Sequence, residues 1–159
     1  MNYLRMESPW GPLLLAEDDA GLQLVRFMEG PRAMAPEPGW TPVERLACGV
    51  EVQLDEYFRG RRQSFDLPYA RRGTDFQQQV WKALDDIPFG QTMSYGDIAR
   101  QIGRPKAVRA VGAANGANPW AIVRPCHRVI GSNGTLTGYA GGLAYKEGLL
   151  ALEAGVLPE

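Results

Sequence analysis

Cys126 and His127 are neighbours in a segment, residues 122–130, that is otherwise largely apolar. A cysteine attacks carbon as the thiolate, so a catalytic Cys126 needs a base that removes its proton. His127 is the only histidine of the chain and would have to be that base. Pro125 restricts its own φ and steers Arg124 away from the helical region, so we expect a stiff, extended segment around the thiol. The pattern predicts nucleophilic chemistry at Cys126.

Composition narrows the class of protein. The chain has 159 residues, with 45% hydrophobic and 22% charged side chains, which is ordinary for a globular protein of one or two small domains. Its two cysteines, Cys48 and Cys126, do not make a disulfide framework, and no CxxC or HxxxH spacing suggests zinc. We therefore expect no metal and no cofactor. The apolar run at residues 12–16 is too short for a signal peptide or a membrane span, so we expect a cytoplasmic protein without a membrane partner.

Charge is distributed unevenly along the chain. Residues 1–70 carry seven basic and eleven acidic side chains, whereas residues 91–130 carry six basic side chains and one acidic side chain. Such a basic region is typical of a nucleic-acid-binding face, although a solvated helical face is the alternative for a charge cluster alone.

The N-terminal part predicts a small α/β module. Residues 1–29 favour β structure, with apolar segments at 13–16 and 22–27 around a turn. Residues 30–42 are rich in proline and glycine and predict a loop. Apolar residues from Val43 to Phe58 recur at helical spacing, and Gly60 would end that helix. Residues 64–67 predict a last strand and residues 68–73 a linker. We divide the chain into residues 1–72 and residues 73–159.

The C-terminal part predicts mostly helices. Thr74-Asp75-Phe76-Gln77 has the pattern of a capping box, and Ser94 can cap a short helix that Gly103 ends. A second helix is expected over residues 106–115. Two short helices joined by a tight turn are typical of a helix-turn-helix. The many small residues of the second helix suit either close helix packing or close approach to nucleic acid. A final helix is expected from Leu143 to Gly155.

Several of these motifs together resemble the O6-alkylguanine-DNA alkyltransferases of the bacterial constitutive type. The resemblance is strong over residues 74–155 and looser over residues 1–70. It implies a ribonuclease-H-like N-terminal module, a three-stranded sheet with a helix, followed by a mostly helical domain with a helix-turn-helix. The motifs that carry it are Asn118-Pro119, Pro125-Cys126-His127-Arg128-Val129-Ile130-Gly131, Gly138-Tyr139-Ala140-Gly141-Gly142 and Lys146-Glu147, with Thr74-Asp75-Phe76-Gln77, Tyr95-Gly96 and Arg109-Ala110-Val111-Gly112 upstream.

This resemblance implies DNA repair by a protein that reacts once. An O6-alkylguanine, or an O4-alkylthymine, of duplex DNA would be flipped into a pocket, and Cys126 would take the alkyl group as a permanent thioether. Activation would run from cysteine to histidine, water and glutamate, with Glu153 as the glutamate. The protein would act as a monomer, with cooperative assembly on DNA left open, and would associate with the nucleoid when bound to DNA.

The resemblance also assigns individual residues. Asn118 would brace the active-site turn, and Tyr95 would donate its hydroxyl to the leaving guanine. Arg109 would fill the space of the flipped nucleotide while its helix lies in the minor groove. The catalytic residues are expected to be Cys126, His127, Glu153, Asn118 and Tyr95. The expected pocket residues are Tyr95, Val129, Tyr139, Ala140, Trp120 and Ala121. The expected DNA contacts are Arg109, Ala110, Ala113, Ala114, Arg104, Lys106 and Arg128.

Two positions depart from the family pattern. Ala121 stands where some relatives have a proline over the pocket. We expect this smaller side chain to admit bulkier O6 adducts unless Trp120 beside it fills the space. Arg124 stands at a commonly apolar position, where it would contact a phosphate or reach solvent.

Alternatives remain for the function and for the single residues. A lone buried cysteine is more often structural, and a lone histidine is more often a hydrogen-bonded core residue. A non-enzymatic DNA-binding protein, either an alkyltransferase-like damage sensor or a regulator, is one alternative; such a sensor would keep the pocket but replace the cysteine, which is present here. A cysteine hydrolase using Cys126, His127 and Glu153 would turn over, although hydrolase pairs usually come from separate segments.

Overall fold

The computed structural model describes residues 1–30, 33–132, 134 and 143–156. Strands β1 (Asn2–Ser8), β2 (Gly11–Asp18) and β3 (Gly21–Phe27) form an antiparallel meander, and β4 (Thr41–Pro42) pairs in parallel with β1, giving the order β3-β2-β1-β4. β2 is buried on both faces. Leu13 and Leu15 face the main core, while Leu14 and Ala16 are covered by Met34 and Trp40. The sheet thus has one short strand more than the expected three.

Helix α1 (Val50–Phe58) is shorter than predicted at its N-terminal end. Residues 43–49 are not helical because other groups bind their amides. The Val43 N–H donates to the Tyr3 carbonyl (2.9 Å), and the amides of Ala47 and Cys48 donate to the buried Glu17 carboxylate (2.5 and 3.0 Å). Gly49 then takes the left-handed conformation (φ 71°) immediately before the helix. Tertiary contacts override the apolar periodicity here.

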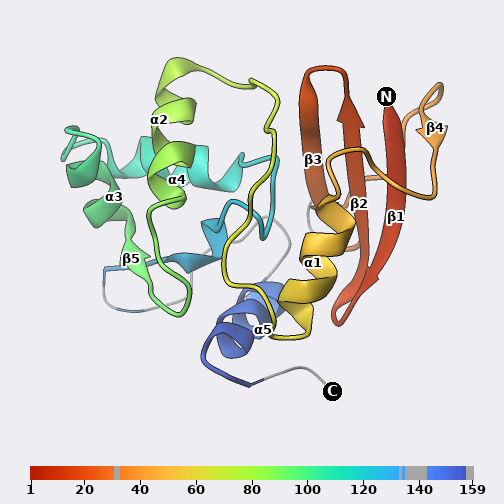
Figure 1. Ribbon diagram of the computed structural model, residues 1–159. Helices are drawn as coiled ribbons and strands as arrows, with labels where there is room; N and C mark the ends of the chain where they lie inside the picture. Colours follow the sequence, from red (N-terminus) through yellow and green to blue (C-terminus); the bar gives the residue numbers. More distant parts are fainter. Residues whose placement is uncertain (31–32, 133, 135–142, 157–159) are drawn as a thin grey trace.

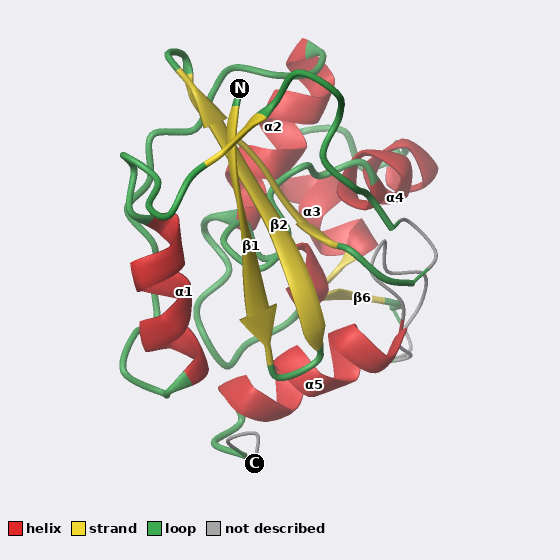
Figure 2. Cartoon of the chain, turned by 90° about the vertical axis from the view of Figure 1, so that its right-hand side faces the viewer, coloured by secondary structure: helices red, strands yellow, loops and turns green. Residues whose placement is uncertain are grey.

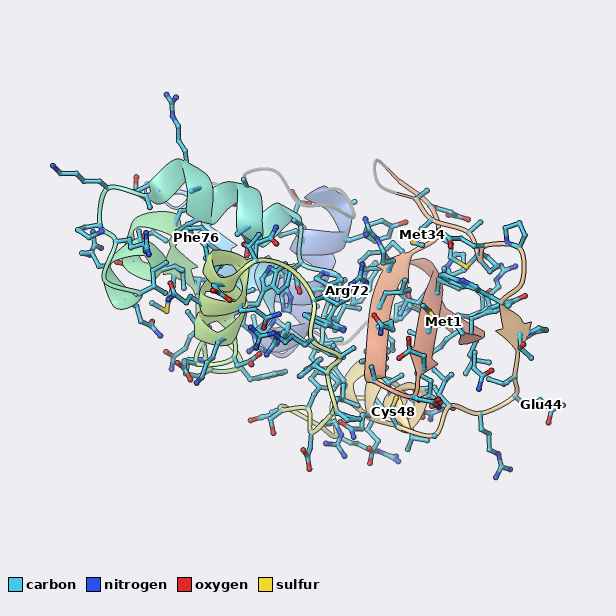
Figure 3. The ribbon with its side chains drawn as sticks, turned by 90° about the horizontal axis from the view of Figure 1, so that it is seen from above. Met1, Met34, Glu44, Cys48, Arg72 and Phe76 are labelled. Atoms are coloured by element: carbon cyan, nitrogen blue, oxygen red, sulfur yellow. The ribbon has the colours of Figure 1, made fainter. Side chains whose placement is uncertain are left out.

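The prediction of a strand at 64–67 is wrong, and the linker expected at 68–73 is held against the sheet. Residues 61–68 form no strand, and the chain instead runs along β3. The Leu22 N–H donates to the Pro68 carbonyl (2.7 Å), and the Ala70 N–H donates to the Leu22 carbonyl (3.0 Å). Arg72 lies between the sheet and the helices and donates to the Gln23 carbonyl (2.8 Å) (Figure 3). The connection between the two parts is therefore fixed to the edge of the sheet.

The C-terminal helices begin at the caps that the sequence predicts. α2 (Asp75–Leu84) starts with the Thr74–Gln77 capping box, and α3 (Tyr95–Gln101) starts with a second box formed by Ser94 and Asp97. α4 (Val108–Gly116) begins two residues later than expected, because the Ala107 N–H still closes a turn with the Arg104 carbonyl (2.9 Å). In Figure 1 these three helices lie together on one side and the sheet lies on the other. α3, the turn and α4 form the predicted helix-turn-helix pair.

Trp120 joins the two parts into one core. Its side chain is fully buried, its Nε1 donates to the Leu22 carbonyl (2.8 Å), and its ring meets Trp81 and Tyr69 edge-on. The backbone around it pairs with Val25 of β3 on both sides. This contradicts the prediction that Trp120 lines the substrate pocket, because the rest of the protein covers its side chain completely.

Helix α5 (Leu143–Glu153) crosses the end of the sheet, as Figure 2 shows. Gly148 allows this approach, because a Cβ there would lie 2.6 Å from Cε2 of Trp10 in the β1–β2 turn. Among the described residues, no helix is long and apolar enough to cross a membrane.

Candidate active site

Cys126 lies in a tight turn rather than in the extended segment that we predicted. Residues Cys126–Arg128 form a 3-10 turn, which leads into β6 (Val129–Ile130), and β6 pairs in parallel with β5 (Met93–Ser94). The Cys126 N–H donates to the Arg124 carbonyl (2.7 Å), and the Arg128 N–H donates to the Pro125 carbonyl (3.0 Å). The restricted φ of proline suits the start of such a turn as well as a strand, which explains the error.

Two asparagines hold the backbone of this turn. Asn118 donates through Nδ2 to the carbonyls of Arg124 (2.9 Å) and Trp120 (3.2 Å), and its Oδ1 accepts from the Trp120 amide (3.2 Å). Asn115 of α4 donates to the Cys126 carbonyl (3.3 Å). Asn118 therefore lies where a bracing residue is needed. Asn115 was missed, although a buried amide at the end of a helix that precedes the motif is a usable signal.

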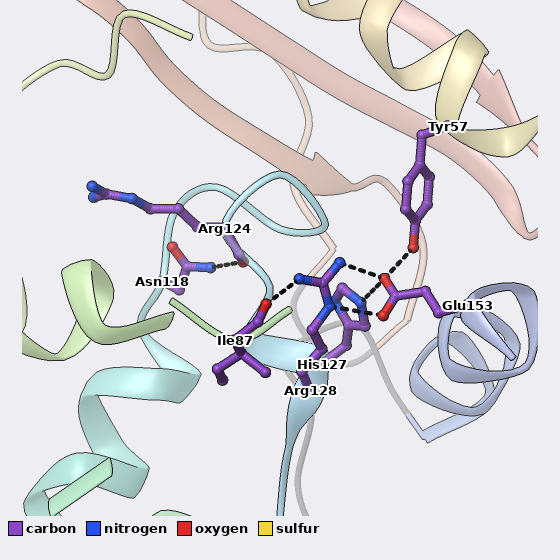
Figure 4. A network of polar contacts seen from close by, with 7 residues as sticks. All are labelled: Tyr57, Ile87, Asn118, Arg124, His127, Arg128 and Glu153. Carbon is purple, nitrogen blue, oxygen red and sulfur yellow. Dashed lines mark hydrogen bonds and ion pairs between the residues drawn. The ribbon is translucent and has the colours of Figure 1, made fainter. Parts of the chain in front are cut away.

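His127 and Glu153 form a buried pair, with 2.7 Å between Nε2 and Oε2. The two side chains are 0% and 1% exposed. The expectation of a water between histidine and glutamate is therefore wrong, because the contact is direct. Arg128 also binds this carboxylate, with Nε 2.7 Å from Oε1 and a terminal nitrogen 2.9 Å from Oε2 (Figure 4). The Tyr57 hydroxyl donates to Oε2 as well, at 2.7 Å.

The electrostatics of this pair define the tautomer of His127. Burial alone would raise the pKa of Glu153, but the hydrogen bonds from His127 and Arg128 outweigh it and hold that pKa well below its usual range. Burial lowers the pKa of His127, and Glu153 only partly opposes this. The ring is thus neutral near pH 7, with its proton on Nε2 facing the carboxylate. The other ring nitrogen, Nδ1, is left as a base, and it is buried without a hydrogen-bond partner among the described residues.

Lys146 is a buried cation beside the site, to which we assigned no role from the sequence. It is fully buried on α5, and its Nζ donates to the Val129 carbonyl (2.5 Å). Burial lowers the pKa of its ammonium, and a charge interaction with Cys126 acts in the opposite direction. A positive charge here stabilises a thiolate. Lys146, Leu149 and Glu153 recur at i, i+3 and i+7, so their shared face was visible in the sequence.

Arg128 and Ala114 do not lie where DNA could reach them, and both predictions need correction. Arg128 is 5% exposed, and besides Glu153 it binds the Ile87 carbonyl (2.6 Å). It holds the Glu153 carboxylate in place. Ala114 is 3% exposed and faces α2, where its carbonyl accepts from Trp81 Nε1 (2.8 Å). A basic or small residue in a motif does not by itself show which way it points.

Arg124 is largely covered and is held by other side chains of the protein. It pairs with Asp85 (3.1 Å), and its guanidinium lies 4.4 Å from the Tyr69 ring centre and 5.0 Å from that of Trp120. Its side chain is only 12% exposed. The pair fixes the loop before Cys126 to the C-terminal end of α2.

The remaining predicted DNA contacts share one exposed surface. We define the α4 face as Arg104, Lys106, Arg109, Ala110 and Ala113, all of which are exposed. Tyr95 of α3 is half-buried behind this face, close to Gly112. Ala121 is half-buried and Val129 is buried, while Tyr139 and Ala140 lie outside the described residues.

Fold and site together define a class of protein: a small β-sheet module joined to a helix-turn-helix domain, with a buried Cys-His-Glu constellation between them. Two family models match the chain. The 6-O-methylguanine DNA methyltransferase ribonuclease-like domain matches residues 1–70, and the DNA-binding domain of the same family matches residues 75–155.

Individual relatives agree with these matches. A methylated-DNA–protein-cysteine methyltransferase of Methanosarcina acetivorans is 53% identical over 96% of this chain and 98% of its own length. One of Mycobacterium bovis is 50% identical over 99% of this chain and 95% of its own length. The crystal structure of Mycobacterium tuberculosis OGT in complex with DNA has a TM-score of 0.90, with 50% identity over 99% of this chain and 96% of that one.

The chain belongs to the 6-O-methylguanine DNA methyltransferase family, which repairs DNA by alkyl transfer. Its enzyme class is methylated-DNA–[protein]-cysteine S-methyltransferase. The expected fold class, a ribonuclease-like module with a small sheet followed by a helical DNA-binding domain, is confirmed.

Proposed function

We propose that Cys126 accepts the alkyl group, and that its donor is O6-alkylguanine in duplex DNA. The observation that carries this proposal is the buried pair formed by Glu153 and His127, the residue that directly follows Cys126 in the chain. The carboxylate binds the Nε2 proton, so the lone pair of His127 is on Nδ1, where it can take the thiol proton. The thiolate then attacks the alkyl carbon, an S–C bond forms, and the C–O6 bond breaks with its electron pair going to guanine.

The leaving base needs a proton to depart as neutral guanine. We assign that donor role to the Tyr95 hydroxyl, and we place the base in a pocket formed with Ala121, Val129, Tyr139 and Ala140. Asn118 acts by bracing the turn that carries Cys126. None of the assigned groups can hydrolyse the thioether on Cys126, so the thiol is not regenerated and each molecule reacts once. O4-alkylthymine is a second substrate of the same chemistry.

The α4 face would lie against DNA, with Arg109 filling the space of the extruded nucleotide. Ala110 and Ala113 are exposed and small, which lets the helix approach a narrow groove. We further propose two functional parts, residues 1–72 and 73–159, in a protein that acts as a monomer. We place it in the cytoplasm, associated with the nucleoid while it is bound to DNA.

Intact-mass spectrometry after incubation with an O6-methylguanine duplex tests the proposal. One methyl group per protein should appear, and peptide mapping should place it on Cys126. Cys126→Ser should abolish transfer and retain binding. Cys48 is the internal control, because burial raises the pKa of its thiol to about 12 and makes it a poor nucleophile.

Three results would contradict the proposal. An unmodified protein that nevertheless binds the lesion tightly would support the damage-sensor alternative. Repair of many lesions per molecule would refute the single reaction, and repeated cleavage of an ester substrate would point to a hydrolase.

A further inference from the structure

Glu153 receives a hydrogen bond from the N-terminal module. Tyr57 of α1 points across the boundary between the two parts, and its hydroxyl lies 2.7 Å from Oε2, although the two residues are 96 positions apart (Figure 4). Both side chains are buried. Nothing in the proposed chemistry so far uses this contact, and a simple scaffold would not need to place a polar group there.

The position of the Tyr57 hydroxyl is closely defined. Its ring is fully buried and meets Phe58, Phe65 and Phe89, with ring centres 5.7, 5.4 and 6.1 Å away. Phe89 also lies under the Arg128 guanidinium at 5.8 Å. Burial, and then the Glu153 charge, raise the pKa of Tyr57, so the phenol stays protonated and donates.

Tyr57 and His127 donate to the same oxygen. Oε2 accepts from the phenol and from Nε2 of His127, both at 2.7 Å, while Arg128 binds both carboxylate oxygens. The phenol draws negative charge away from Oε2, so the carboxylate pulls less strongly on the imidazole proton. The charged groups acting on His127 are Glu153, Arg128 and Lys146, and the phenol is a neutral donor added by α1.

We propose that Tyr57 is a positioning residue of the transfer reaction: through Glu153 it keeps His127 neutral and its Nδ1 available as the base. This inference rests on the proposed function of Cys126 and His127. It gives the N-terminal module a part in activating the thiol.

The sign of the expected effect follows from the shared oxygen. Without the phenol, Oε2 carries more charge and stabilises the imidazolium, so His127 protonates at higher pH. The pKa of Glu153 also rises, because one donor to its ionised form is removed. Transfer needs a neutral His127, so the change at His127 moves the acid limb of the rate to higher pH. The change at Glu153 has the same sign but acts at much lower pH, because its pKa stays well below its usual range.

Tyr57→Phe is the test variant, because it removes the hydroxyl and keeps the ring. Its rate of methyl transfer from an O6-methylguanine duplex to Cys126 should fall about threefold or more below about pH 6.5 and stay near wild type at high pH. Phe58→Leu loosens the same aromatic cluster without reaching Glu153, and it should leave the midpoint of the profile unchanged. Tyr3→Phe, which removes a hydroxyl on the other side of the sheet, is the second control.

His127 also provides a readout that does not depend on activity. As the only histidine, it gives an unambiguous pair of imidazole nitrogen resonances in labelled protein. In Tyr57→Phe these should titrate about half a pH unit or more above wild type, with the Nε2-protonated tautomer at high pH in both proteins. An unchanged titration and an unchanged rate profile in a folded Tyr57→Phe protein would overturn the inference. So would an equal shift in Phe58→Leu.

The two proposals fail in different ways. A wild-type protein that takes no methyl group on Cys126 refutes the proposed function, and the nitrogen titration then decides alone whether Tyr57 controls His127. A wild-type protein that is methylated on Cys126, with Tyr57→Phe indistinguishable from it in both measurements, refutes only the role of Tyr57.

Discussion

Gly148 of α5 and Trp10 of the β1–β2 turn are in such close contact that no side chain fits between them. An added Cβ would overlap the indole, with Cε2 only 2.6 Å away. The contact fixes how α5 crosses the sheet, and α5 carries both Lys146 and Glu153. Docking of the N-terminal module therefore bears directly on the position of the Glu153 carboxylate.

Gly148→Ala should lower the free energy of unfolding. Overpacking a filled site costs about 1–3 kcal/mol, and the gain in helix propensity of about 1 kcal/mol offsets only part of it. Gly112→Ala in α4 is the matched control, because its Cβ would meet Tyr95 at an ordinary 3.9 Å, so its free energy of unfolding should not fall. Urea denaturation of both variants checks this. Equal stabilities would contradict the overlap at Trp10.

Stability should decrease as the pH falls below neutrality, because of His127. Its pKa in the folded protein is lowered, chiefly by burial, so the unfolded chain binds the proton more readily. The folded protein buries the neutral imidazole, so its free energy of unfolding decreases as the pH falls through the unfolded pKa of about 6.5. The slope is up to about 1.4 kcal/mol per pH unit. Denaturation between about pH 7.5 and pH 5.5 measures the slope, within the range in which histidine titrates.

His127→Gln should remove that slope, since the chain has no other histidine. The Glu153 carboxylate makes stability depend on pH in a lower range. Because the folded pKa of Glu153 is depressed, its stabilisation is complete above its unfolded pKa of about 4.3 and is lost as the pH falls further. A slope that persists above about pH 5.5 in His127→Gln would place the titrating group elsewhere.

Arg124→Leu should slow methyl transfer without weakening DNA binding. The substitution removes the ion pair with Asp85 and the stacking on Tyr69 and Trp120, at a cost of about 1–3 kcal/mol of stability. The Arg124 carbonyl accepts from the Cys126 amide, so a looser loop misplaces the thiol. Single-reaction rates and DNA affinity, measured on the same duplex, separate the two effects. A drop in affinity at an unchanged rate would restore Arg124 as a phosphate contact.

Arg109→Ala should weaken DNA binding at every sequence and reduce its dependence on salt. Removing one interaction with a phosphate lowers the slope of log affinity against log salt by about 1. Arg59→Ala is the control, because it removes an exposed arginine of the N-terminal module that pairs with Asp55. It should change neither the affinity nor the slope. Equal effects of the two substitutions would argue against the α4 face as the docking surface.

Arg128→Ala should behave unlike Arg109→Ala. It leaves the buried Glu153 carboxylate without its bidentate partner, which costs about 3–5 kcal/mol, and the salt dependence of DNA binding should be unchanged in whatever protein remains folded. Thermal unfolding and a salt titration together test this. A normal melting temperature with a smaller salt slope would show that Arg128 does contact DNA.

Local patterns in the sequence determined much of this protein. The capping boxes at Thr74 and Ser94 predicted where α2 and α3 begin, because these signals involve residues only three positions apart. The Pro-Cys-His-Arg motif identified the candidate nucleophile and base, and the resemblance to a family supplied Glu153. Each of these needs only short-range chemistry or a known motif.

Only the tertiary structure decided which way the side chains point and what reaches them from far along the chain. Arg128 and Trp120 were expected at a surface or in a pocket and are instead buried, and Arg124 is largely covered through its pair with Asp85. The start of α1 depends on the Glu17 carboxylate, 30 residues away from the Ala47 amide that it binds. The Tyr57–Glu153 contact likewise joins α1 and α5 through residues that are 96 positions apart. Such contacts arise from packing between elements that are distant in sequence, so no local pattern predicts them.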